Sequence, residues 1–379
     1  MYKKFVLIPD SFKGTMSSQE ICGIMAGAIS AAAPGAEIRQ IPVADGGEGS
    51  VDAFLRAIGG ERIAAAVKGP YMEDMEAHYA LIDGGAAAVI EMAACAGLPL
   101  VEGRADPSKT TTYGAGQLIL DAARRGAKRI IVGLGGSATN DGGCGAAAAA
   151  GARFYGAGGE AFIPVGGTLG EIERIDVSGI RAALGGAAVT AMCDIDNPLY
   201  GPQGAAHIFG PQKGADPHMV ERLDAGLRNL GDKIKRSLGA DMSGMPGAGA
   251  AGGMGAGMAA FFGAELKMGI EVVLDAVRFE EIIAGADMIL TGEGKIDGQS
   301  LRGKVVIGVA RRARASGIPV VAIVGDIDKS AKGAYEEGVS GIFSINLLAE
   351  DFAKAKLHAR EDLAFTVENL VRFITAINK

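Results

Sequence analysis

Cysteine and histidine are both scarce in this sequence of 379 residues. Four cysteines and four histidines are scattered along it, and no C-x-x-C pair occurs. Zinc sites need clustered cysteine or histidine ligands, so the sequence gives no support for a zinc protein. We expect reduced, mostly buried thiols at Cys22, Cys95, Cys144 and Cys193.

Basic segments and long apolar runs are also lacking. The formal net charge is −7, whereas proteins that bind nucleic acid present a basic surface. No apolar run approaches the ~20 residues of a membrane-spanning helix, and the run within residues 1–9 is too short for a signal peptide. We therefore expect a cytoplasmic protein with no nucleic-acid or membrane partner.

Two familiar nucleotide-binding signatures are absent or out of context. The pattern G-x-x-x-x-G-K-[ST] does not occur, which excludes a P-loop protein. Residues 247–252 fit G-x-G-x-x-G, but they follow Met245-Pro246 rather than a strand, and no βαβ unit surrounds them. We interpret them as a mobile, close-packed helix start rather than a dinucleotide-binding loop.

Glycine, in contrast, is abundant. The chain has 60 glycines, about twice the usual ~7%, and they cluster beside Asp, Glu, Ser and Lys. These clusters predict ligand-binding loops, and the chain length predicts two domains.

The richest of these loops is 133–143. The apolar run 130–132 precedes it, and the helix-forming segment 144–152 follows it. A glycine turn between a strand and a helix leaves backbone N–H groups free at the positive end of the helix dipole. The loop is thus predicted to hold an anion or a hydroxy acid, the alternative being an ordinary turn with helix-capping residues. Its hydrogen-bonding side chains are Ser137, Thr139, Asn140 and Asp141.

The two ends of the chain alternate strands and helices, which predicts a parallel sheet. Ser17 to Glu20 form a capping box, so a helix is expected from there towards Ala33. Polar glycine loops at 9–14, 44–49 and 291–300 leave strand ends, where ligands of such sheets bind. We join 1–60 and 287–379 into one doubly wound α/β domain. The expected strands are 4–8, 38–43, 287–290, 320–324 and 342–345.

The middle of the chain, 61–286, reads as an inserted domain of mixed α+β type. Asp83-Gly84-Gly85 predicts a hairpin turn between short strands, and Asp216-Pro217 predicts the start of a long helix. Asp194 and Asp196 follow the strand 188–192 and would share a face if that strand stayed regular.

Carboxylates, lysines and glycines recur together in six loops. One acidic loop residue is usually a turn former, but this mixture is what phosphoryl transfer needs. Backbone amides and lysines neutralise phosphates, carboxylates hold Mg²⁺, and one carboxylate accepts the proton of the attacking hydroxyl. The charged residues are Asp10, Asp45, Glu48, Asp141, Asp194, Asp196, Glu293, Asp297, Lys13, Lys213, Lys295 and Lys304.

Six motifs in this order resemble the bacterial type-1 glycerate kinase family. They are residues 9–14, 44–49, 133–143, 193–199, 209–215 and 291–297, and they span essentially the whole chain. The resemblance implies ATP-dependent, Mg²⁺-dependent phosphorylation of D-glycerate, with 2-phosphoglycerate favoured as the product, in glycerate, glyoxylate or sugar-acid catabolism. It also implies a cleft between a flavodoxin-like domain and a nested mixed α/β domain, in a monomer or homodimer.

Roles follow from the resemblance and the residue chemistry together. Asp194 is expected to be the general base, worth about 10²–10⁴ in rate, with Lys13 as a second catalytic residue. Asp45 and Asp297 are the expected Mg²⁺ ligands. Substrate binding is assigned to Ser11, Ser137, Thr139, Asn140, Asp141 and Asn197. For Ser137, Thr139 and Asn140 the sequence leaves both glycerate and phosphate open as the bound group. Phosphate or nucleotide binding is assigned to Gly46, Gly47, Glu48, Lys213, Gly292, Glu293 and Lys295.

Two alternatives remain open at this point. Residues 133–138 also resemble the glycine-serine loop of the galactokinase–homoserine kinase superfamily, which does not account for the other five motifs. A catalytically silent sensor of sugar acids could use the same fold, although the sequence shows no helix-turn-helix or basic output segment.

Overall fold

The computed structural model describes residues 3–43 and 49–377. The chain divides into two compact units, each described separately below. Unit 1 comprises Met1–Ala44, Asp52–Ile58 and Met268–Lys379, and unit 2 comprises Asp45–Val51 and Gly59–Lys267. The α/β class expected from the sequence is confirmed, because both units combine sheets with helices.

Unit 1 is built on a five-stranded sheet in which every neighbouring pair is parallel. The strands are β1 (Lys4–Pro9), β2 (Glu37–Gln40), β12 (Met288–Ile296), β13 (Val320–Ile327) and β14 (Val339–Ser344). Their spatial order is β14-β13-β12-β1-β2, so the first strand of the chain lies beside a strand that begins at Met288. Phe5 is opposite Met288 and Ile8 is opposite Thr291.

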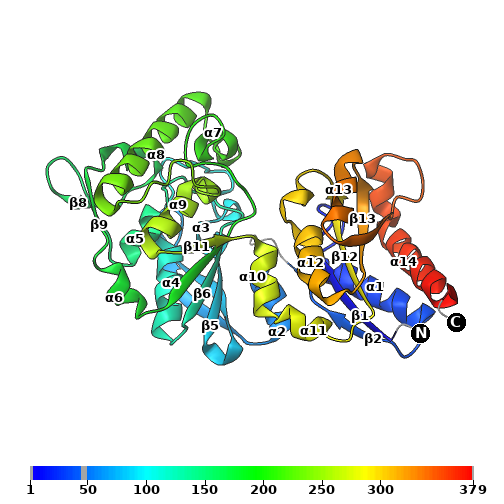
Figure 1. Ribbon diagram of the computed structural model, residues 1–379. Coiled ribbons are helices and arrows are strands. Elements are labelled where there is room, and N and C mark those ends of the chain that lie inside the picture. Colours follow the sequence, from blue (N-terminus) through cyan, green and yellow to red (C-terminus); the bar gives the residue numbers. More distant parts are fainter. Residues whose placement is uncertain (1–2, 44–48, 378–379) are drawn as a thin grey trace. The chain divides into compact units, whose positions relative to one another are not determined.

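Helices cover both faces of this sheet, which explains why β1 is almost continuously apolar. Phe5 and Leu7 belong to a core with α1 (Ser18–Ala32) and α14 (Phe352–Ile377), which lie side by side in Figure 1. The helix α12 (Val305–Ala313) packs against β1, β12 and β13. The remaining helices of unit 1 are α2 (Ser50–Ile58), α10 (Gly269–Ala276), α11 (Phe279–Ile283) and α13 (Gly333–Glu336).

Local sequence signals set the ends of these helices. The predicted capping box is confirmed, since Glu20 N donates to Ser17 Oγ at 3.2 Å and Ser17 N donates to Glu20 Oε2 at 3.2 Å. Residues 268–286, which the sequence analysis assigned to the inserted domain, group with unit 1. Arg312 on α12 accounts for part of this attachment, because its guanidinium donates to Asp275 of α10 and Glu280 of α11 at 2.8 and 2.6 Å.

Unit 2 contains a mixed six-stranded sheet with the order β11-β10-β6-β5-β4-β3. Its strands are β3 (Glu61–Lys68), β4 (Asp74–Ile82), β5 (Ala87–Glu91), β6 (Arg129–Gly133), β10 (Ala188–Met192) and β11 (Glu265–Lys267). The strands β11, β10, β6 and β5 run parallel to one another. β4 runs antiparallel to β5, and β3 runs antiparallel to β4. The predicted hairpin turn is confirmed, because residues 83–85 join β4 to β5.

The helices α4 (Tyr113–Arg124) and α9 (Ala250–Phe262) pack on this sheet. The predicted long helix is confirmed as α8 (Pro217–Leu238), capped by Asp216, whose Oδ1 accepts from Met219 N at 2.7 Å. The shorter helices are α3 (Ala93–Ala96), α5 (Cys144–Ala149), α6 (Ile180–Leu184) and α7 (Ala205–Phe209). A small antiparallel sheet contains β7 (Arg153–Tyr155), β8 (Ala161–Phe162) and β9 (Arg174–Asp176).

Among the described residues, no helix combines the length and the apolarity needed to span a bilayer. The four cysteines are free and buried, as the sequence predicted.

Candidate active site

A pocket lies at the carboxyl ends of two neighbouring strands in unit 2. The strands β6 and β10 are parallel, with Gly133 opposite Met192, so the loops that follow them leave the same edge of the sheet. Leu134 N donates to Met192 O at 3.3 Å and holds these two exits together. The pocket has a volume of about 260 Å³. It is lined by Leu98, Leu134, Gly135, Gly136, Ser137, Met192, Cys193, Asp194, Ile195, Phe209, Gln212, Lys213, Ala250 and Ala251.

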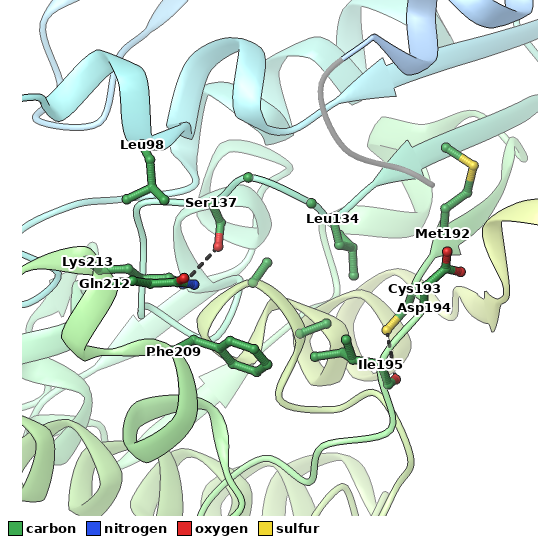
Figure 2. Close-up of a pocket in the computed structure, with 14 residues that line it drawn as sticks. Leu98, Leu134, Ser137, Met192, Cys193, Asp194, Ile195, Phe209, Gln212 and Lys213 are labelled. Carbon is green, nitrogen blue, oxygen red and sulfur yellow. Dashed lines mark hydrogen bonds between the residues drawn. The ribbon is translucent and has the colours of Figure 1, made fainter. Parts of the chain in front are cut away.

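Lys213 and Ser137 form a buried polar pair on one side of this pocket (Figure 2). Lys213 Nζ donates to Ser137 Oγ at 2.8 Å and to Thr139 O at 2.7 Å. The lysine is only 2% exposed, and burial lowers its pKa to about 7, while the neighbouring Asp141 carboxylate acts in the opposite direction. A lysine in this state changes its charge readily when a ligand binds beside it.

Asp141 is fully buried and has a structural role in the same loop. Its Oδ2 accepts from Thr112 N at 2.8 Å, Thr112 Oγ1 at 2.9 Å and Gly145 N at 3.1 Å, and its Oδ1 accepts from Gly143 N at 3.1 Å. Burial raises the pKa of Asp141, and these donors oppose the rise. Both oxygens are thus engaged by the protein itself, so Asp141 positions the loop.

These contacts contradict the prediction that free backbone N–H groups after the loop 133–143 would bind an anion. The sequence suggested that the helix after the glycine turn leaves its first N–H groups free. In the structure α5 is short, and Asp141 takes the N–H groups of Gly143 and Gly145, while Thr112 Oγ1 accepts from Ala146 N at 2.9 Å. The cation available to a ligand in this pocket is instead the side chain of Lys213.

Thr139 and Asn140 carry polar atoms that the described residues leave unpaired. Both side chains are 0% exposed, and Thr139 Oγ1, Asn140 Nδ2 and Asn140 Oδ1 have no hydrogen-bond partner within the described part of the chain. Buried polar atoms are nearly always satisfied by protein, ordered water or ligand. This loop therefore has spare hydrogen-bonding capacity next to Lys213.

The chain after β10 does not follow the predicted geometry. The strand ends at Met192, so Asp194 and Asp196 do not alternate on a regular strand. Beyond the strand, Cys193 Sγ donates to Ile195 O at 3.3 Å. Asp194 still reaches the pocket, on the side away from Lys213 (Figure 2). Asn197 does not line it, since its Nδ2 donates to Gln203 O at 2.8 Å.

The helix start at 247–252 is close-packed, as predicted. Residues 251–253 have left-handed backbone conformations at the start of α9, and Gly142 N donates to Gly252 O at 3.0 Å. A Cβ on Gly252 would lie 2.0 Å from Thr139 O, the carbonyl that accepts from Lys213. Only glycine allows this close approach, so α9 packs directly against the loop 133–143.

In unit 1, the segment predicted as the loop 291–300 is partly strand. β12 continues to Ile296 because β13 continues beside it, pairing Lys295 with Asp326 and Ile296 with Ile327. Gly292, Glu293 and Lys295 therefore lie within β12. The composition of this segment resembles a loop, but pairing with a neighbouring strand overrides that preference.

Glu293 is buried at this end of β12. It is 6% exposed, and its Oε1 has no hydrogen-bond partner among the described residues. Burial raises its pKa to about 7, and the carboxylates of Asp10 and Asp297 add to the rise. The Ser300 hydroxyl and the Lys304 ammonium act in the opposite direction.

The exit loop of β1 is tied to the same region. Asp10 N donates to Gly292 O at 2.8 Å, and Ser11 N donates to Asp10 Oδ1 at 2.6 Å. Ser11 is partly buried and Lys13 is exposed. Asp297 Oδ1 accepts from Gln299 N at 2.8 Å, which orders the turn after β12.

Four predicted site residues, Asp45, Gly46, Gly47 and Glu48, lie outside the described residues. Within residues 3–43 and 49–377, no cluster of three or more His, Cys, Asp or Glu side chains could hold a metal ion.

The sequence reasoning overlooked several residues of the unit 2 pocket. Phe209 and Gln212 line it, and Thr112 holds Asp141. The run Thr110-Thr111-Thr112 before a helix is the signal that could have drawn attention to Thr112. Phe209 and Gln212 belong to the recognised motif 209–215, in which only Lys213 received a role.

Comparisons with known proteins agree with the motif resemblance. The model of the Glycerate kinase family matches residues 5–375. The chain is 42% identical to the glycerate kinase of Bacillus subtilis (strain 168), covering 98% of this chain and 97% of the relative. It is 44% identical to the glycerate 2-kinase of Escherichia coli (strain K12), covering 90% of each. A crystal structure assigned as glycerate kinase 2 from Salmonella typhimurium LT2 matches with a TM-score of 0.86 and 40% identity over 100% of both chains.

Proposed function

Since this chain belongs to the glycerate kinase family and is therefore a phosphotransferase, we propose that it transfers the terminal phosphoryl group of ATP to D-glycerate in a Mg²⁺-dependent reaction. The name of the Escherichia coli relative, a glycerate 2-kinase, favours the 2-hydroxyl group as the acceptor.

The pocket of unit 2 is the observation that carries this proposal. Its volume of about 260 Å³ is below the 300–1,000 Å³ typical of sites for drug-sized ligands and suits a three-carbon acid. Lys213 offers positive charge and Asp194 offers a carboxylate on the other side. A polar three-carbon acid needs groups of both kinds, one for its own charge and one to accept a hydroxyl proton.

Asp194 is the proposed general base. It is partly buried at the pocket wall, and it is a carboxylate that a hydroxyl group in the pocket could approach. Ser137 lines the pocket and is proposed to bind the substrate. Thr139 and Asn140 do not line it, so their unpaired side-chain atoms are proposed to contact the substrate only if the loop shifts on binding. Asp141 and Asn197 support this arrangement through the backbone rather than by touching the substrate.

Unit 1 carries the residues proposed to hold the phosphates and the metal ion. The unpaired Oε1 of Glu293, close to Asp10 and Asp297, suits a hard cation that prefers oxygen ligands. Mg²⁺ commonly uses only one or two carboxylates and completes its shell with phosphate and water, so the described residues fit it. When bound, the ion would neutralise charge on the transferring phosphoryl group. Ser11, Lys13, Gly292 and Lys295 are the proposed phosphate contacts.

We also propose that unit 1 is a flavodoxin-like domain, with unit 2 nested in its sequence. Numbered along the chain, the five strands of unit 1 have the spatial order 2-1-3-4-5, which is the order of flavodoxin-like sheets. Ligands of such sheets bind beyond the carboxyl ends of the strands, where Ser11 and Asp297 lie.

The proposal is tested by measuring ADP release with every combination of ATP, Mg²⁺ and D-glycerate. ADP should form only when all three are present, and EDTA should abolish it because the phosphates lose their counter-ion. NMR of the product should show phosphate on the 2-hydroxyl. Turnover that survives EDTA or needs no hydroxy acid would refute the proposal, and glycerate binding without ADP release would favour the sensor alternative.

A further inference from the structure

Lys213 is placed in the pocket by a short, rigid segment. It ends a single 3₁₀ turn, Pro211–Lys213, and Gly214 follows with a φ of 93°. A Cβ on Gly214 would lie 2.5 Å from Ala105 O, so the backbone at this point is closely packed. The lysine side chain therefore enters the pocket from a fixed position.

The ammonium group of Lys213 has one more N–H than its protein acceptors use. A charged lysine carries three N–H donors, and the structure supplies Ser137 Oγ at 2.8 Å and Thr139 O at 2.7 Å. Lys213 is itself part of the pocket wall, so the third donor can serve a ligand there. It is the only cationic side chain among the described residues that line the pocket.

No described carboxylate neutralises this lysine directly. The contacts of Lys213 Nζ are to Ser137 Oγ and Thr139 O, and both oxygens of the nearby Asp141 accept hydrogen bonds from Thr112, Gly143 and Gly145. Asp194 lies on the other side of the pocket (Figure 2). The Cys193 thiol stays neutral, since burial raises its pKa to about 11. A buried charge without a partner is unfavourable, so a charged Lys213 would be stabilised by an anionic ligand in the pocket.

We propose that Lys213 binds the carboxylate of the acceptor acid, rather than a nucleotide phosphate, and that the protein takes up a proton when the acid binds. The proton moves from solvent to the neutral amine of Lys213, and the resulting ammonium pairs with the carboxylate; no other bond changes. This inference rests on the proposed function and specifies how its substrate is held. It also reassigns Lys213, for which the sequence favoured a phosphate or nucleotide role.

Proton uptake can be measured on the full-length protein by titration calorimetry with D-glycerate in two buffers of different ionisation enthalpy. With a pKa of about 7 in the free protein, uptake should be about 0.9 proton per bound acid at about pH 8 and about 0.1 at about pH 6. Glyceramide, in which a neutral amide replaces the carboxylate, should cause no uptake. Titration with Mg²⁺-ATP should also cause none.

Two substitutions distinguish the loss of Lys213 from the loss of any other lysine. Lys213→Met should abolish the uptake and weaken glycerate binding by about 10- to 100-fold, because a charge-assisted hydrogen bond is lost. Lys235→Met is the control, since Lys235 is exposed on α8 and pairs with Asp241 at 2.7 Å, and it should match the unmodified protein.

The results distinguish this inference from the proposed function. If glycerate supports ADP release but binds without proton uptake, or if uptake follows Mg²⁺-ATP instead, this inference fails and the proposed function stands. The same conclusion follows if Lys213→Met binds glycerate normally. If glycerate neither binds nor supports ADP release, the proposed function fails and this inference fails with it.

Discussion

At the scale of single residues, the buried Glu293 predicts that the stability of the fold depends on pH. Its pKa rises from a usual value of 4.5 to about 7 on folding, so the folded state binds more protons between these values. Stability should therefore fall as the pH rises through this window. Glu293→Gln removes the ionisation, and above about pH 7 it should raise the free energy of unfolding by on the order of 1–3 kcal/mol.

Chemical denaturation in EDTA at about pH 5 and about pH 8 measures this effect. The gain should be small at the lower pH and reach its full size at the higher one. Glu281→Gln, at an exposed position of α11, is the matched control and should show no such dependence. An equal effect of Glu293→Gln at both pH values would mean that the buried carboxyl does not titrate in this window.

Asp194 is the residue on which the proposed chemistry depends most. Asp194→Asn keeps the size of the side chain but removes the base, so kcat should fall by about 10²–10⁴ with little change in the KM for glycerate. Asp196→Asn is the control two residues away, exposed and outside the pocket, and should stay near the kcat of the unmodified protein. A variant at Asp194 within about threefold of that kcat would remove it from the mechanism.

At the scale of elements, sequence reasoning succeeded where a signal is local. The apolar run of β1, the capping box of α1 and the Asp216 cap of α8 each depend on residues close together in the chain, and each was predicted. Sequence reasoning failed where the structure of a segment depends on residues far away in the chain. The glycines of 291–296 suggest a loop until β13 pairs with them, and the bond from Lys213 to Ser137 joins residues 76 apart.

The contact between α9 and the loop 133–143 gives a prediction at this scale. Gly252→Ala would force a left-handed alanine and a Cβ only 2.0 Å from Thr139 O, the acceptor of Lys213. We expect a loss of about 1–3 kcal/mol in stability and a raised KM for glycerate. Gly244→Ala is the control, because a Cβ there meets nothing within 4 Å. Melting temperatures and glycerate kinetics measure both, and a Gly252→Ala protein that matches the control would show that this close contact is dispensable.

At the scale of the whole molecule, β1 depends on the far end of the chain. It lies between β2 and β12, so a fragment of residues 1–286 loses its longer neighbour. A two-stranded remnant is marginal in water, and we expect β1 amides to exchange rapidly in this fragment while amides of β5, β6 and β10 stay protected. Hydrogen exchange with mass spectrometry tests this. Protected β1 amides and one cooperative melt would contradict the nested arrangement.

The position of β1 also has a consequence during synthesis on the ribosome. Phe5 to Ile8 leave the exit tunnel well before their partners in β12, which are made roughly 280 residues later. At about 5–20 residues per second, this delay is roughly 15–60 s, during which the whole of unit 2 is translated. During this delay the apolar residues of β1 cannot pair with β12. We expect the apolar segment to stay exposed during this delay, because the order of the two units along the chain places all of unit 2 between β1 and β12.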